Sequence, residues 1–136
     1  MCKYTKKKVK IKNKPLHYIS SDGFHIYVGK NNLQNDQLTF HFAVGNDWWF
    51  HAKQAPGSHV IVRTNGAELP DTTFEEAARL AAYYSSMRGS DKVEIDYVEK
   101  KQVKKPGGGK PGFVVYYTNY SMVIDSNISQ IRLCAD

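Results

Sequence analysis

The chain has 136 residues, a net charge of +6 and 41% hydrophobic residues, which is enough for one ordinary hydrophobic core. It contains no apolar stretch of the roughly twenty residues that a membrane span needs, and no signal peptide follows the N-terminal lysines. Its two cysteines, Cys2 and Cys134, each lie within three residues of a terminus, where a disulfide framework or a metal site would constrain the fold little. These features predict a cytoplasmic domain without a membrane segment.

Positive charge is concentrated in two short segments. Residues 1–14 contain seven lysines and no acidic residue, and residues 99–112 contain five lysines and one glutamate. Residues 15–98 contain six basic and ten acidic residues. This distribution is typical of a protein that binds a polyanion, although a lysine-rich end can also serve solubility alone. We predict that residues 1–14 are a basic flexible arm or a linker remnant and that residues 15–136 form the folded domain.

Strands dominate the first half of the predicted domain. Apolar residues alternate with other residues over 24–28 and 38–44, and further apolar segments at 47–53 and 59–64 follow turn-forming pairs. We therefore predict four strands, with an asparagine-rich loop over 29–36 between the first two. Alternation along the third strand sends the side chains of Trp48 and Trp49 to opposite faces, so at least one of them belongs to the core.

A helix is predicted to begin after residue 70. Two pairs match a capping box at its start: Thr72 with Glu75, and Thr73 with Glu76. Apolar residues then recur at helical spacing. Arg88 suits the last turn, and Gly89 suits the left-handed cap that ends a helix.

Strands resume after the helix. Alternation predicts one strand over 92–100, and residues 113–118 and 121–125 are predicted to form a last hairpin around residues 119 and 120. Strands, one helix and strands again predict an α+β domain with a mainly antiparallel β-sheet and one principal α-helix packed on one face.

A basic loop, residues 100–112 (KKQVKKPGGGKPG), joins two of these strands. Glycines let backbone N–H groups approach a phosphate closely, and lysines release counterions from a nucleic-acid backbone. The loop lacks the spacing of a phosphate-binding P-loop and precedes a strand instead of a helix. A mobile, solvated hairpin loop is the alternative interpretation.

Two further features can contact RNA. Residues 29–36 (GKNNLQND) combine amides with a lysine, and the aromatic run 48–51 faces His59 and Arg63 on the neighbouring predicted strand. Amides bond base edges and phosphates, and aromatic rings stack unpaired bases. The sequence contains no nucleophile elbow of the form GxSxG that would place a serine beside a histidine and an aspartate. Its five histidines do not have the spacing of metal ligands, such as HExxH. We therefore expect no catalytic residue, metal or cofactor.

The chain resembles the C-terminal RNA-binding domain of the NFACT family, called NFACT-R. The stretches that carry the resemblance lie between residues 18 and 129, in family order: YISSDGFHIYVGKNNLQND (18–36), NDWWFHAK (46–53), PGSHVIV (56–62), EEAARLAAYYS (75–85) and VKKPGGGKPGFVVY (103–116). In longer family members, an N-terminal domain, a helix-hairpin-helix segment and a coiled coil precede this domain. The resemblance therefore implies either an excised domain or a free-standing copy.

What the resemblance implies is a role in ribosome-associated quality control. Family members bind a large ribosomal subunit obstructed by a peptidyl-tRNA and recruit charged tRNA, alanyl-tRNA in bacteria, so that a C-terminal tail is added without mRNA. The expected partners are tRNA, the large subunit and the other NFACT domains, with no membrane. A protein-interaction module is the alternative, either docking to those domains or acting as a fibronectin-binding adhesin, as older names of bacterial members suggest.

The candidate RNA-binding residues come from the two loops and the strands between them. They are Lys30, Asn31, Asn32, Gln34, Asn35, Asp36, His51, Lys53, His59, Arg63, Lys104, Lys105 and Lys110.

Overall fold

A seven-stranded sheet forms the centre of the computed structural model, which describes residues 14–134. Its strands follow the order β8-β5-β3-β4-β2-β1-β9, and every neighbouring pair is antiparallel. The strands are β1 (Leu16–Ile19), β2 (His25–Val28), β3 (Trp48–Ala52), β4 (Val60–Val62), β5 (Val93–Glu99), β8 (Tyr120–Ile124) and β9 (Arg132–Leu133). The predicted fold class, α+β with a mainly antiparallel sheet, is confirmed. The predicted arm lies outside the described residues except for Lys14.

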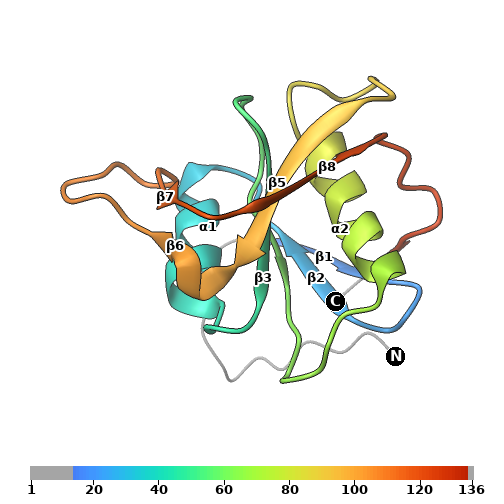
Figure 1. Ribbon diagram of the computed structural model, residues 1–136, viewed down its shortest axis with the longest axis horizontal. Coiled ribbons are helices and arrows are strands. Elements are labelled where there is room, and N and C mark those ends of the chain that lie inside the picture. The colour runs from blue at the N-terminus through green and yellow to red at the C-terminus, as the bar shows by residue number, and fades with distance from the viewer. Residues whose placement is uncertain (1–13, 135–136) are drawn as a thin grey trace.

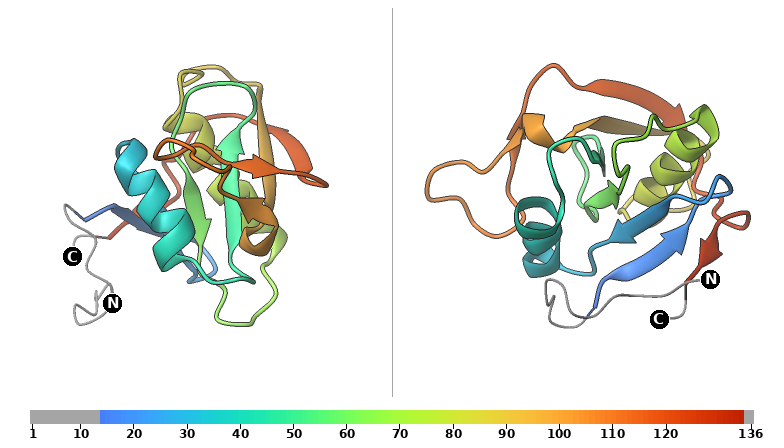
Figure 2. Two further views of the ribbon diagram at one scale, coloured as in Figure 1. Left: turned by 90° about the vertical axis from the view of Figure 1, so that its left-hand side faces the viewer. Right: turned by 90° about the horizontal axis from the view of Figure 1, so that it is seen from below.

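Different elements cover the two faces of the sheet (Figure 1). The principal helix, α2 (Asp71–Tyr83), packs on one face, as predicted. The other face carries helix α1 (Asn32–Gln37), which continues into the π-helix η1 (Leu38–Phe42). A small hairpin also lies there, formed by β6 (Val103–Lys104) and β7 (Val115–Tyr116) after the 3-10 helix η2 (Lys100–Gln102). Figure 2 shows this three-layer arrangement from two further sides.

Each face of the sheet has its own hydrophobic core because side chains alternate along a strand. Phe50 is fully buried against α2, whereas Trp49 is fully buried on the opposite face, beneath η1 and the β6–β7 hairpin. Trp48 is half-buried on the α2 side. Four alanines of α2 are buried, and their small side chains let the helix lie close to the sheet.

The prediction of a loop over 29–36 and a strand over 38–44 is wrong, because both segments are largely helical. Asn31 accepts a hydrogen bond from the backbone N–H of Gln34 at 2.8 Å and so caps α1. Leu38 and Phe42 are four residues apart and both face the core around Trp49. The apolar pattern of this segment fits a helical turn as well as a strand, and tertiary packing selects the helix.

The two predicted capping boxes are not formed: α2 begins at Asp71, and the residue at its N-cap position, Pro70, makes no side-chain cap. Thr73 instead donates a hydrogen bond to Asp22 at 2.7 Å, and Glu76 accepts one from the backbone N–H of Ser21 at 2.7 Å. The side chains that matched a cap therefore hold the turn between β1 and β2 against the helix.

The helix also ends earlier than predicted, at Tyr83. After it, the backbone hydrogen-bonds to residues 56–58: the N–H of Ser58 donates to the carbonyl of Tyr84, and that of Ser86 donates to the carbonyl of Pro56. Arg88 lies beyond the helix, yet its Nε donates to the carbonyl of Tyr83 at 2.7 Å. The helix therefore stops where these tertiary backbone bonds begin.

The predicted hairpin between 113–118 and 121–125 is wrong. β7 pairs with β6, and β8 pairs with β5 at the edge of the large sheet.

Within residues 14–134 no helix has the length and hydrophobicity to cross a bilayer.

Candidate nucleic-acid interface

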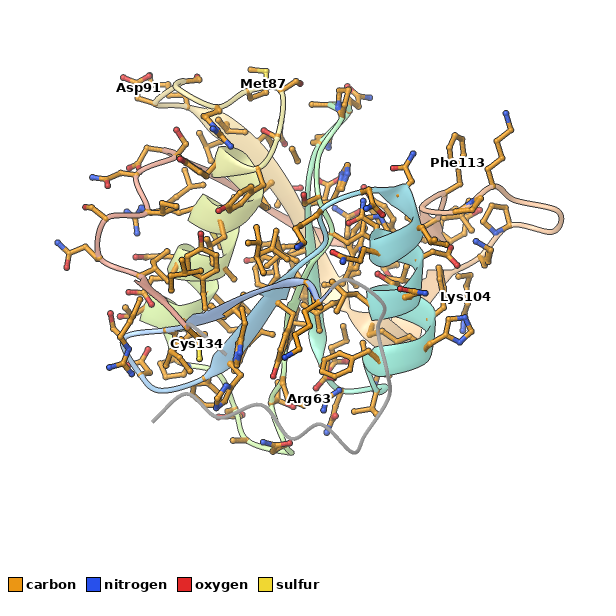
Figure 3. All side chains as sticks on the ribbon, turned by 180° about the vertical axis from the view of Figure 1, so that it is seen from behind. Arg63, Met87, Asp91, Lys104, Phe113 and Cys134 are labelled. Atoms are coloured by element: carbon orange, nitrogen blue, oxygen red, sulfur yellow. The ribbon has the colours of Figure 1, made fainter. Side chains whose placement is uncertain are left out.

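The structure brings the basic loop against α1, where the amide-rich segment lies. Asp36 of α1 forms an ion pair with Lys105 and accepts a hydrogen bond from the backbone N–H of Gly112 at 3.1 Å. These contacts lower the pKa of the Asp36 carboxyl against the opposing effect of burial. Figure 3 shows Lys104 and Phe113 on the α1 side of the molecule. We call the surface formed by Lys30, Asn31, Asn32, Lys104, Lys105 and Lys110 the basic face.

Gly112 is needed for this docking. Its backbone φ of +85° is one that residues other than glycine rarely adopt. A Cβ atom at this position would also lie 3.2 Å from Oδ1 of Asn32. Its N–H is already bonded to Asp36. Gly112 therefore serves close packing of the loop on α1, which differs from the predicted use of the glycines to open the backbone toward a phosphate.

His59 holds the basic loop in place through a hydrogen bond to the backbone of Gly112. The residue is 2% exposed, and its Nε2 lies 3.1 Å from the carbonyl oxygen of Gly112. A carbonyl only accepts, so Nε2 carries the proton, and Nδ1 accepts from the hydroxyl of Thr39 at 2.8 Å. Burial, reinforced by the neighbouring His51, lowers the pKa of His59 to about 3. The imidazole is thus neutral and fully occupied by bonds within the protein.

The amide side chains that were predicted to contact RNA fall into a buried group and an exposed group. Gln34 and Asn35 are buried, where Gln34 accepts from the backbone N–H of Lys30 at 2.9 Å and Asn35 accepts from that of His59 at 3.0 Å. Asn31 and Asn32 are exposed at the start of α1. The buried amides therefore shape the interface, and the exposed ones and Lys30 present groups to solvent.

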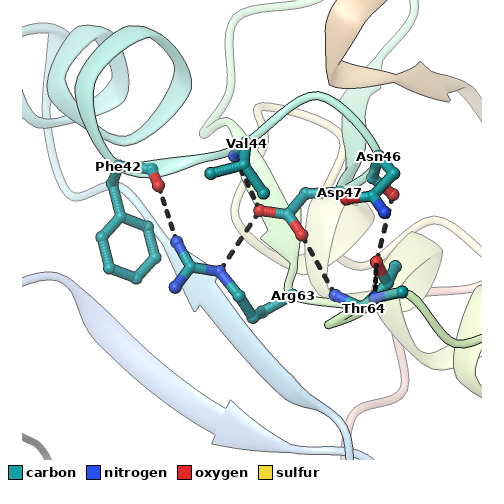
Figure 4. Close-up of polar contacts among 7 residues, drawn as sticks. Phe42, Val44, Asn46, Asp47, Arg63 and Thr64 are labelled. Atoms are coloured by element: carbon teal, nitrogen blue, oxygen red, sulfur yellow. Dashed lines mark hydrogen bonds and ion pairs between the residues drawn. The ribbon is translucent and has the colours of Figure 1, made fainter.

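Arg63 is held by a buried carboxylate (Figure 4). Its Nε lies 3.2 Å from Asp47, whose side chain is 0% exposed, and its Nη2 donates to the carbonyl of Phe42 at 2.6 Å. The guanidinium also lies 4.0 Å from the centroid of the Phe42 ring. Asp47 accepts two further bonds, from the backbone N–H groups of Val44 at 2.9 Å and Thr64 at 3.1 Å. This network joins the end of η1 to β4.

The two remaining candidates lie on or beside β3. His51 is half-buried and stacked on Trp49, and burial lowers its pKa. Lys53 lies 3.7 Å from Glu94 and 3.8 Å from Asp96. Contact between RNA and His51, Lys53, His59 or Arg63 stays a prediction, and the geometry gives each of them a bond or packing partner within the domain.

The family model of the NFACT protein RNA binding domain matches residues 14–118, a span that contains the whole basic face. The chain belongs to this family. It is 49% identical over 112 residues to an Rqc2 homolog RqcH of Streptococcus suis and 45% identical over 107 residues to that of Bacillus subtilis. These matches cover 82% and 79% of the chain but 20% and 18% of the relatives. The chain therefore spans about a fifth of their length.

A solved structure has the same fold as this NFACT domain. It is the C-terminal part of a fibronectin/fibrinogen-binding protein from Streptococcus suis, which superposes with a TM-score of 0.83 at 44% identity. The superposition covers 92% of the present chain and 50% of that one.

Exposed aromatic residues beside the basic loop of the NFACT domain were not among the sequence-based candidates. Phe113 is 57% exposed and Tyr117 is 74% exposed, on the segment that leads out of the loop through β7. Val114 and Tyr116, which alternate with exposed residues here, are half-buried. All five residues of the run 113–117 are apolar or aromatic, so the sequence indicates a strand but not which rings are exposed. Among residues 14–134, no group of three histidine, cysteine, aspartate or glutamate side chains is arranged to hold a metal ion.

Proposed function

We propose that the domain is a non-enzymatic RNA-binding module of ribosome-associated quality control. In this role it contacts tRNA or large-subunit rRNA in the cytoplasm and supports tailing of stalled nascent chains without mRNA. The cognate tRNA in a bacterium would be alanyl-tRNA, and the other domains of a full-length NFACT protein would hold the ribosome. Membership in a family of RNA-binding domains and similarity to RqcH proteins support this proposal.

The observation that carries the proposal is the docking of the basic loop on α1. Asp36 and His59 fix the loop, so lysines from two distant segments present charge on one surface. Lys30, Lys104 and Lys110 are exposed and have no carboxylate partner among the residues that the structure describes. Unpaired cations on the surface are suited to phosphate contacts, which supply most of the sequence-independent affinity for RNA.

Replacing Lys104 and Lys110 with alanine is expected to weaken tRNA binding and to reduce its salt dependence. Each lost phosphate contact removes about 0.7 to 0.9 from the slope of log K against log salt concentration, so the double variant should lose roughly 1.5. Fluorescence anisotropy with labelled tRNA at several salt concentrations measures this slope. Lys105 is left in place because its ion pair with Asp36 holds the loop.

A charge-matched control distinguishes the basic face from general positive charge. Lys92 and Arg132 are also exposed and lack a carboxylate partner within residues 14–134, but they lie outside the basic face. The K92A/R132A variant should keep the wild-type slope. Equal losses in the two variants would show that the loop has no special role.

Phe113 and Tyr117 are expected to stack on unpaired bases beside the lysines. Their replacement with alanine should weaken binding of a single-stranded RNA by about 1 to 3 kcal/mol per stacked base, with little change for a fully paired duplex. Both side chains are largely exposed, so the melting temperature should stay close to that of the wild type. Identical losses for the single strand and the duplex would argue against stacking.

A protein-interaction role is the second candidate, because the similar solved structure carries the name of a fibronectin/fibrinogen-binding protein. Surface plasmon resonance with immobilised fibronectin, in parallel with tRNA, compares the two. Binding of fibronectin that survives K104A/K110A, together with no measurable tRNA binding, would favour this alternative.

A further inference from the structure

A groove with acidic and aromatic walls lies on the α2 side of the sheet. One cavity of about 480 Å³ lies between α2, β3, β5 and β8, and a second of about 470 Å³ lies beside the loop 64–69. Trp48 and Phe74 line both cavities, so the two adjoin at these rings. The basic loop packs on the other face of the sheet, and a ligand in the groove would leave the basic face free.

Four aromatic residues line the first cavity. The ring centroid of Trp48 lies 4.9 Å from that of Phe74, 5.9 Å from that of Tyr97 and 6.0 Å from that of Tyr120. Trp48, Phe74 and Tyr97 are half-buried, whereas Tyr120 is 58% exposed. An aromatic ring attracts a cation placed over its face through the ring quadrupole, so a cavity lined by several rings is suited to a cationic side chain.

The charges around the groove have one sign. Asp71 and Glu75 line the first cavity, and Glu68 and Glu99 line the second, whereas no lysine, arginine or histidine lines either. Asp71 and Glu75 have no ion pair among the described residues, and Glu99 pairs with Lys101 at 3.3 Å. Burial, followed by Tyr120 and then Asp71, raises the pKa of Tyr97, which is consistent with a carboxylate close to the rings. These carboxylates repel phosphates and attract cationic side chains.

We propose that this groove binds an extended peptide segment of a partner protein that carries lysine or arginine side chains. The cationic groups lie against Trp48, Tyr97 and Tyr120, and the carboxylates of Asp71 and Glu75 balance their charge. The two cavities share Trp48 and Phe74 in their linings, so together they accommodate an extended chain. The inference does not depend on RNA binding, and it gives the domain two surfaces of opposite chemistry.

The test uses a fluorescein-labelled pentapeptide of alternating lysine and glycine, its arginine counterpart, and a glutamate counterpart. Polarisation at low salt should show binding of the two cationic peptides and none of the acidic one. The D71N/E75Q variant removes two exposed charges without changing shape and should weaken binding about tenfold. Tyr120→Ala should weaken it by a similar factor, because it removes the most exposed ring.

Two control variants test whether peptide binding depends on the groove. D91N/E94Q removes the same charge at exposed positions that line neither cavity, and it should bind the peptides like the wild type. K104A/K110A should also leave peptide affinity unchanged, whatever it does to tRNA. Equal weakening by D71N/E75Q and D91N/E94Q would overturn the proposal in favour of nonspecific charge attraction. Loss of single-stranded RNA binding in Tyr120→Ala with unchanged peptide affinity would overturn it in favour of base stacking.

Discussion

The Asp47→Ala variant is expected to lose about 3 to 5 kcal/mol of unfolding free energy, because it removes the fully buried partner of an ion pair and leaves the donors that bound this partner without an acceptor. Asp47 is fully buried and accepts from Arg63 and from the backbone N–H groups of Val44 and Thr64. Its loss leaves both N–H groups without an acceptor, and each such group costs about 1 to 3 kcal/mol. Urea unfolding followed by tryptophan fluorescence measures the change.

A second aspartate in the same chain provides a matched control. Asp125 lies 3.1 Å from Nε of Arg79, almost the same separation as Asp47 from Arg63, but its side chain is 40% exposed. Asp125→Ala should therefore cost less than about 1 kcal/mol. Similar losses for the two alanine variants would mean that burial of Asp47 has little energetic effect. Asp47 also matters for the RNA-binding prediction, because its carboxylate holds Arg63, one of the candidate RNA-binding residues, within the fold.

Lowering the pH from 7 to 5 is expected to destabilise the domain by about 2 kcal/mol through His59 alone, and by about 4 kcal/mol at pH 3. The folded state holds the pKa of His59 at about 3, below its ordinary value of 6.5. Between these values the unfolded chain binds a proton that the folded chain excludes. The stabilisation is therefore complete above pH 6.5 and is lost as the pH falls toward 3. Denaturant unfolding at several pH values gives the profile.

One variant and one direct measurement isolate this contribution. His59→Gln removes the titrating ring and should flatten the profile between pH 7 and 5 by about 2 kcal/mol relative to the wild type. In the folded wild-type protein, the NMR signals of the His59 ring should not titrate above pH 4.5. A normal titration near pH 6.5 would contradict the buried, neutral imidazole.

The two surfaces of the domain follow from the two faces of its sheet. Residues that alternate along β3 send Trp49 beneath the basic loop and Trp48 toward α2. The first face therefore supports a cationic surface, and the second supports the acidic, aromatic groove. The two proposed binding surfaces therefore lie on opposite faces of the sheet.

Sequence patterns predicted the features that depend on near neighbours in the chain. Alternation located β2 and β5, apolar segments after turn-forming pairs located β3 and β4, helical spacing located α2, and the lysine distribution located the basic loop. The segment of β8 was also predicted to be a strand, although with the wrong partner. The family resemblance was also readable from the motifs, and the matching family model confirms it. Local patterns succeed here because the period of apolar residues follows directly from strand and helix geometry.

Contacts between distant residues decided the rest. Phe40 and its neighbours fit either a strand or a helix, and packing against Trp49 selected the helix. Thr73 and Glu76 matched a helix cap locally but bind the turn between β1 and β2, 51 to 55 residues away. His59 and Arg63 have the chemistry of RNA contacts in sequence, yet Gly112 and Asp47 occupy them in the fold. The sequence alone determined which groups were available, and only the tertiary structure determined which remained exposed, because burial and pairing depend on partners that no local pattern specifies.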